Sequence, residues 1–145
     1  MRLVARCFLL PNTVNPEEAK MRTRAILPRV LVQVVVRRAV ANERTVEMMA
    51  WQSRSAESSG CLLARTVEMD LLLRIAGTTQ ISRAIRECGA KSGGENVLIV
   101  AGDSRSLDPP KLARLGLKDR LPRSELSDGD SALVERAAML NAVRG

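Results

Sequence analysis

The side chains of this sequence that could carry out chemistry are few and scattered. The chain contains no histidine, which removes the Ser/His and Cys/His pairs that commonly activate a nucleophile. Glu68 and Asp70 stand two positions apart in a segment expected to be helical, so their carboxylates point in different directions. The acidic residues at 17–18 and at 128 and 130 stand at expected helix starts, where capping and the helix dipole explain them. The sequence therefore predicts no catalytic residues and a protein that is not an enzyme.

The run Lys91-Ser92-Gly93-Gly94 has the composition of a phosphate-binding loop, but its surroundings are wrong for one. A Walker-type loop follows a strand and opens a helix. This run follows a helical pattern and precedes the apolar strand pattern at 96–101. We therefore expect a plain turn here, and no small-molecule substrate or cofactor.

The three cysteines, Cys7, Cys61 and Cys88, are far apart and form no CxxC pair. An odd number at this spacing fits a reducing compartment and small buried side chains, so we expect a cytoplasmic protein without a metal site. The longest apolar runs are too short to cross a membrane, so no membrane partner is expected.

The composition predicts one globular domain, residues 1–145, with a basic surface. The net charge is +7 and the isoelectric point is near 10.3, and 19 of the 23 basic residues are arginine. Such an excess favours a polyanion or an acidic partner, although a well-solvated basic surface explains it equally well. With one Trp, one Phe and no Tyr, any bound RNA would be held by arginine and backbone contacts rather than by stacking.

The elements that must position any site follow from hydrophobic periodicity and capping residues. Strands are expected at 2–10, 30–36 and 96–101, and helices at 16–27, 43–54, 62–76, 79–88, 111–115 and 131–143. This order predicts an α+β fold in one domain. The strand at 30–36 is apolar on both faces apart from Gln33, which is typical of a central strand.

The segment from 62 to 88 predicts two consecutive helices that differ in their surroundings. The first is apolar on nearly every side, so it is either a central helix or one shared between the core and an interface. Asp70 and Arg74 in it form an i,i+4 pair. The second has a one-sided stripe that we expect to face the core, formed by Ile81, Ala84, Ile85 and Cys88.

The segment from Val30 to Val100 resembles a known family, the PRPK-binding (kinase-binding) subunit of the KEOPS complex, in its archaeal type. The matching blocks are VLVQVVV, a methionine-rich helix, LLARTVEMDLLLRIAGTTQISRAI, Cys88-Gly89 and NVLIVA. The specific part is a helix followed by Gly-Thr-x-Gln-Ile. The KEOPS complex makes threonylcarbamoyladenosine in tRNAs that read codons starting with A.

The resemblance implies a small antiparallel sheet packed with several helices, and a non-catalytic accessory subunit without a cofactor. Members of this family bind the small atypical kinase/ATPase of the complex through helices and the C-terminal segment. Archaeal-type members also bind tRNA, including its 3′ end. The competing interpretation is a general protein-interaction scaffold whose basic surface is incidental.

The expected site residues come partly from the resemblance and partly from their placement. The kinase-facing candidates are Leu72, Ile75, Thr78, Gln80, Ile81, Met139, Leu140 and Val143, with core packing as the alternative for each. For tRNA, Arg65 matches a basic position before the helix, and the arginines proposed from charge and placement are Arg37, Arg38, Arg74, Arg83 and Arg86. Many relatives have a basic residue where this chain has Thr79, and Arg83, one turn on, could replace that charge.

Overall fold

Three antiparallel strands form the sheet of the computed structural model, which describes residues 2–144, with side chains as far as residue 142. The strands β1 (Leu3–Leu10), β2 (Leu31–Val36) and β3 (Asn96–Asp103) are arranged in the order β1-β3-β2. β1 pairs with β3 along its whole length, and β2 pairs with the other side of β3. The α+β fold with an antiparallel sheet is therefore confirmed.

The position of β2 corrects the sequence-based expectation, because this strand lies at an edge of the sheet and β3 is central. All six residues of β2 are nevertheless buried, since helices cover both faces of the strand. The Gln33 amide helps to close the edge: its Oε1 accepts from the Val34 N–H (3.0 Å) and its Nε2 donates to the Glu68 carbonyl (2.8 Å). A fully apolar pattern reports burial, and here helices supply the burial that a neighbouring strand would give.

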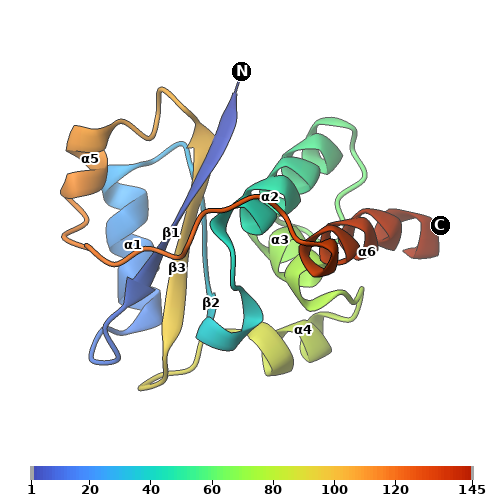
Figure 1. Ribbon diagram of the computed structural model, residues 1–145, viewed down its shortest axis with the longest axis horizontal. Helices are drawn as coiled ribbons and strands as arrows, with labels where there is room; N and C mark the ends of the chain where they lie inside the picture. The colour runs from blue at the N-terminus through green and yellow to red at the C-terminus, as the bar shows by residue number, and fades with distance from the viewer. Residues whose placement is uncertain (1, 145) are drawn as a thin grey trace.

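Helices cover both faces of the sheet (Figure 1). One face carries α1 (Pro16–Ile26) and α5 (Pro109–Ala113). The other carries α2 (Glu43–Ser58), α3 (Val67–Ala76), α4 (Ile81–Cys88) and α6 (Asp128–Arg144), with the short 3-10 helix η1 (Arg37–Ala39) after β2. Each face has its own apolar cluster, and alternate β2 residues contribute to the two.

Polar side chains set most of the helix starts. Asn15 accepts from two N–H groups of α1, and Asn42 accepts from the Arg44 N–H of α2, so both predicted caps are confirmed. α3 begins at Val67, later than the periodicity indicated, because the Thr66 hydroxyl caps it. α6 begins at Asp128, before the expected start, and α5 at Pro109.

The first turn of α6 contains a reciprocal pair between Ser127 and Asp130. The Ser127 N–H donates to the Asp130 carboxylate and the Asp130 N–H donates to the Ser127 hydroxyl, and each hydrogen bond is 3.1 Å long. This is the geometry of a capping box. The Ser127 N–H lowers the pKa of Asp130 below its ordinary value, because a hydrogen bond to the carboxylate favours the charged form.

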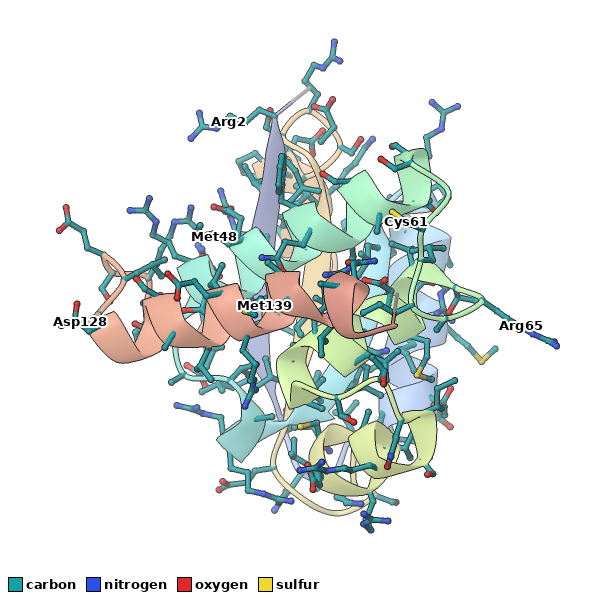
Figure 2. All side chains as sticks on the ribbon, turned by 90° about the vertical axis from the view of Figure 1, so that its right-hand side faces the viewer. Arg2, Met48, Cys61, Arg65, Asp128 and Met139 are labelled. Atoms are coloured by element: carbon teal, nitrogen blue, oxygen red, sulfur yellow. The ribbon has the colours of Figure 1, made fainter. Side chains whose placement is uncertain are left out.

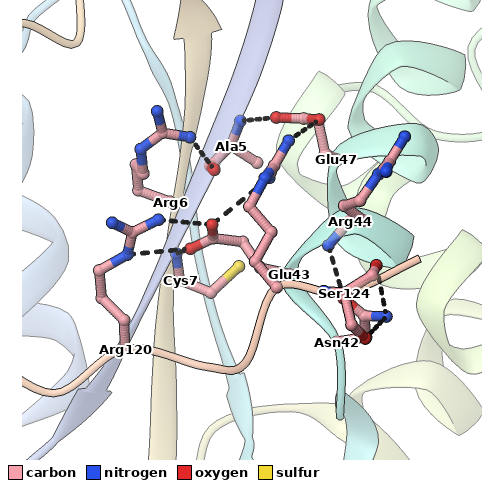
Figure 3. A network of polar contacts seen from close by, with 10 residues as sticks. Ala5, Arg6, Cys7, Asn42, Glu43, Arg44, Glu47, Arg120 and Ser124 are labelled. Carbon is pink, nitrogen blue, oxygen red and sulfur yellow. Dashed lines mark hydrogen bonds and ion pairs between the residues drawn. The ribbon is translucent and has the colours of Figure 1, made fainter. Parts of the chain in front are cut away.

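The free edge of β1 is closed by two carboxylates from α2 (Figure 3). The Ala5 N–H donates to Glu47 and the Cys7 N–H donates to Glu43, and each hydrogen bond is 2.8 Å long. Glu43 has no solvent exposure, and Arg120 donates to it over 2.6 Å. These carboxylates therefore satisfy strand N–H groups that would otherwise be left for another strand.

The segment 119–123, which we call the strap, continues the closure of β1. The Leu9 N–H donates to the Asp119 carbonyl (2.8 Å), and the Leu121 N–H donates to the Cys7 carbonyl (2.9 Å). Arg123 donates to Glu47 over 2.6 Å. Burial, and then the charge of Glu43, raise the pKa of the Cys7 thiol far above its ordinary value.

Two further expectations concern the burial of the cysteines and the lack of a membrane-spanning helix. Cys7 and Cys88 are buried as predicted, whereas Cys61 is exposed, because it lies in the loop that leaves α2. Within the described residues, no helix combines the length and apolar content needed to cross a bilayer.

Candidate partner-binding surface

The candidate surface rests on an ion pair between Asp70 and Arg74 that has almost no solvent exposure. Arg74 Nε lies 2.6 Å from Asp70 Oδ1. Arg74 Nη2 also donates to Asp70 Oδ2 (3.3 Å). The guanidinium further donates to the carbonyl of Ala137 (3.0 Å) and to Asn141 Oδ1 (2.8 Å), both on α6. The predicted i,i+4 pair is therefore confirmed, and it joins α3 to α6.

The burial of Arg74 contradicts its assignment to tRNA. Its side chain is 1% exposed, so no phosphate can reach it in the folded chain. Asp70 is committed as well, because it accepts from the Ser53 hydroxyl (2.5 Å) and from the Leu63 N–H (2.9 Å). The i,i+4 spacing is common on exposed helix faces, and only the packing of α6 makes this pair internal.

The end of α3 is a left-handed turn at Gly77, whose φ is +70°. Its N–H donates back to the Leu73 carbonyl over 2.8 Å. Arg136 of α6 donates to the Ile75 carbonyl (3.2 Å), so a cation lies at the negative end of the α3 dipole. A side chain at Gly77 would collide with that guanidinium. Glycine is thus favoured here by its backbone conformation, and its missing side chain leaves room for the Arg136 guanidinium.

A hollow lies between this turn and α6. Its walls are Gly77, Thr78 and Thr79 on one side, and Ala132, Glu135, Arg136, Met139 and Leu140 on the other. Figure 2 shows Met139 projecting from the outer face of α6, and 64% of its surface is exposed. The lining combines apolar side chains with two threonines and the charged residues Glu135 and Arg136, which suits a protein side chain.

The structure separates the kinase-facing candidates into two groups. Four of them are buried within the chain itself: Leu72, Ile75, Thr78 and Leu140. Leu72 and Ile75 lie on α3, which the sheet, α2, α4 and α6 enclose, so their assignment to a partner surface is wrong. Thr78 and Leu140 line the hollow beside Gly77, so their assignment stays a prediction. Gln80, Ile81 and Met139 are exposed. Val143 lies on α6 in the part whose side chains are outside the described residues.

α4 departs from its predicted one-sided core stripe. Ala84 and Cys88 are buried as expected, whereas Ile81 is 45% exposed and Ile85 is 47% exposed. The periodicity correctly identified an apolar face, but this short helix packs only part of that face against the chain. We call Gln80, Ile81, Ile85, Met139 and the adjoining hollow the α4–α6 surface.

Four of the proposed tRNA-binding arginines gather where η1 packs against α4: Arg37, Arg38, Arg83 and Arg86. Arg38 donates to the Glu87 carbonyl (3.0 Å), and Arg83 forms an exposed ion pair with the Glu87 carboxylate (3.0 Å). Sequence reasoning missed Lys91, which joins this group by donating to the Arg86 carbonyl (3.2 Å). We call Arg37, Arg38, Arg83 and Arg86, without Lys91, the α4 arginine group.

Arg65 stands apart from that group. It projects from the loop before α3 (Figure 2), where it lines a separate hollow with Arg29 and Arg54. The structure therefore does not join all the proposed arginines into one patch. Among the described residues, no set of three or more Cys, Asp and Glu side chains could hold a metal ion.

The chain is similar in sequence to a known protein. No protein-family model matches the chain. The chain is 37% identical over 90 residues to the KEOPS complex subunit Cgi121 of Pyrococcus abyssi (strain GE5 / Orsay). The family resemblance is confirmed. The match covers 61% of this chain and 52% of Cgi121, so the chain spans about half the length of that relative.

Thr79, where the sequence resemblance led us to expect a basic side chain, is half-buried in the wall of the hollow. Arg83, which could replace that charge, is already paired with Glu87. An exposed pair of this kind costs little to open, so the pairing leaves Arg83 available to a phosphate.

Proposed function

We propose that this protein is a non-catalytic accessory subunit of a KEOPS-type complex. In this proposal it binds the atypical kinase/ATPase subunit and tRNA, and so supports the formation of threonylcarbamoyladenosine. The observation that carries the proposal is the exposure of large apolar side chains beside the Gly77–Gln80 turn, in the block that resembles the family most specifically. The similarity to a protein named as a KEOPS complex subunit supports the same role.

The α4–α6 surface has the properties of a protein-docking site. Ile81, Ile85 and Met139 expose between 45% and 64% of their surface on helices that the chain otherwise holds firmly. Apolar side chains of this size lose contact with water when a partner covers them, which is the main favourable term in association. Because Arg74 fixes α6 against α3, the surface is preformed, and little conformational entropy is lost on binding.

The α4 arginine group is the part of the chain that we assign to tRNA. Arg38, Arg83 and Arg86 are exposed, and the guanidinium group suits phosphate recognition by paired hydrogen bonds. No aromatic residue lies on η1 or α4, so these contacts would hold the backbone rather than stack on bases. Binding of this kind weakens steeply with salt.

A pull-down with the cognate kinase subunit tests the protein-binding part. We expect Met139→Glu to weaken capture of the kinase, because the carboxylate would be buried without a partner. Met21→Glu is the matched control, since Met21 is 68% exposed and belongs to α1, which lies across the sheet (Figure 1). Equal capture of both variants and the wild type would remove the α4–α6 surface from the interface.

Binding of tRNA with and without its 3′ CCA end tests the nucleic-acid part. We expect affinity at low salt that falls when the CCA end is removed. Affinity that is absent at low salt, or unchanged after removal of CCA, contradicts a role at the tRNA end. Kinase capture without any tRNA affinity would instead support a general interaction scaffold whose basic surface is incidental.

A further inference from the structure

A second concentration of positive charge lies on the layer of α1 and α5, across the sheet from α2, α3 and α6 (Figure 1). Among the residues that the structure describes, the exposed basic side chains of this layer that make no ion pair are Arg22, Arg24, Arg29, Lys111, Arg114 and Lys118. Lys20 and Arg105 are paired with acidic neighbours. Glu18, Asp108 and Asp119 in the same segments make no ion pair with the described residues either, so the layer keeps a moderate excess of positive charge.

Part of this charge converges on a hollow built by three separate elements. Arg29 comes from the loop before β2, Arg105 from the loop after β3, and Lys111 from α5. Asp103 is the only carboxylate in the lining, and it lies 3.3 Å from Arg105. Three cations thus face one anion.

The sheet topology explains why these loops meet. Leu31 pairs with Ala101, so the start of β2 and the end of β3 lie side by side. Gly102 allows an especially close approach, because a Cβ there would lie 3.1 Å from Val30 Cγ1. The backbone before β2 is therefore held against the end of β3, and Arg29 is placed beside the Arg105 loop.

The chemistry of this hollow matches a phosphate group. Arg29 offers a planar fork of donors and Lys111 offers a compact charge, and both suit phosphate oxygens. No aromatic side chain lines the hollow, so it offers no platform for a base. Its apolar lining residues Leu27 and Val30 are buried, so it also lacks the exposed apolar side chains that a lipid surface would take up.

The hollow is remote from the α4 arginine group. Arg29 precedes β2 and Arg37 follows it, and a strand of six residues places its two ends roughly 20 Å apart at about 3.3 Å per residue. One rigid element therefore carries a basic site at each end. A folded RNA that reaches both ends would contact the protein at two separated places.

We propose that the hollow formed by Arg29, Arg105 and Lys111 binds phosphodiester groups of RNA as a second contact, separate from the α4 arginine group. The choice of RNA as the ligand rests on the proposed function. The contact is independent of base sequence, because only charges and backbone-directed donors line the hollow. It also does not require the 3′ end of a tRNA.

The test uses a tRNA transcript that lacks the 3′ CCA end, with affinity measured by fluorescence anisotropy over a series of salt concentrations. We expect Arg29→Glu and Lys111→Glu each to weaken binding about ten-fold, and to reduce the slope of log affinity against log salt by about one. Arg44→Glu is the matched control, since Arg44 is exposed on α2 and makes no ion pair among the described residues. It should retain the wild-type slope.

Three results overturn the inference or separate it from the proposed function. If the wild type binds the transcript and all three variants match it, the hollow is not an RNA contact. If the wild type binds no tRNA at low salt, the tRNA role fails, and the same variants are compared on a plain RNA duplex, where equal affinities overturn the inference. If Arg29→Glu loses affinity only for vesicles of anionic phospholipid, the hollow binds lipid headgroups and the inference is wrong.

Discussion

The guanidinium group of Arg136 on α6 occupies the space that a side chain at Gly77 would need. Arg136 also donates to the Ile75 carbonyl in the last turn of α3 (3.2 Å). One glycine therefore permits the left-handed end of α3 and leaves the space that the Arg136 guanidinium fills. Because the turn after α3 and helix α6 form the walls of the hollow at the α4–α6 surface, this contact also shapes the proposed docking site.

Substitution of Gly77 should be more costly than substitution of another glycine with the same backbone. Gly77→Ala adds the left-handed penalty of roughly 1–2 kcal/mol and displaces Arg136, so we expect a total loss of about 2–3 kcal/mol. Gly93→Ala is the control, because its φ of +75° carries the same penalty while nothing lies within 4 Å of the added Cβ. Urea unfolding followed by circular dichroism measures both, and equal losses would show that Arg136 contributes nothing.

Removal of Arg74 should destabilise the fold rather than affect a ligand. Arg74→Ala leaves Asp70 buried without its countercharge, and we expect a loss of about 3–5 kcal/mol in the free energy of unfolding. Arg83→Ala breaks an exposed pair with the same i,i+4 spacing, and it should cost under about 0.5 kcal/mol. An Arg74→Ala protein with wild-type stability and weakened RNA binding would contradict the burial of this side chain.

Stability should fall at alkaline pH because of Cys7. Burial raises the pKa of this thiol in the folded state, so its contribution is complete below the unfolded value near 9.0 and is lost as the pH rises above it. The free energy of unfolding should then decrease by about 1.4 kcal/mol in total between pH 8 and pH 10 from this group. The chain has no tyrosine to obscure the effect. Cys7→Ala should remove the share of this loss due to Cys7 and keep the share due to Cys88, whose pKa burial also raises. Denaturant titrations at pH 8 to 10 measure both.

Neutralising Glu43 should loosen the strap from β1. Glu43→Gln keeps an acceptor for the Cys7 N–H but removes the charge that binds Arg120 and Arg123. We expect a loss of about 1.5–3 kcal/mol, which is typical of hydrogen bonds to charged groups, and faster hydrogen exchange at the Leu121 amide. Glu57→Gln, at an exposed pair with Arg54, should change neither.

Local signals in the sequence predicted most of the helices and strands, but they rarely predicted which elements pack around each one. The Asn15 and Asn42 caps were predictable because a cap depends on residues only two or three positions away. The edge position of β2 was not, because an apolar strand pattern records burial and not which element supplies it.

The same distinction applies to the site residues. The pairing of Arg74 with Asp70 could be inferred from spacing, whereas its burial depends on α6, more than sixty residues away in the chain. The exposure of Ile81 and Ile85 was hidden because periodicity identifies an apolar face without showing what covers it. No feature of the sequence pointed to Arg136, since its role depends on Gly77 at the end of α3.

Both edges of the three-stranded sheet are already covered by other parts of the chain. Gln33 and the flanking helices close β2, while Glu43, Glu47 and the strap close β1. No strand of a neighbouring molecule can extend this sheet without first displacing those side chains. Any assembly that includes the chain must therefore be built through helix surfaces and loops, where affinity can be adjusted by single side chains without altering the strand pairing.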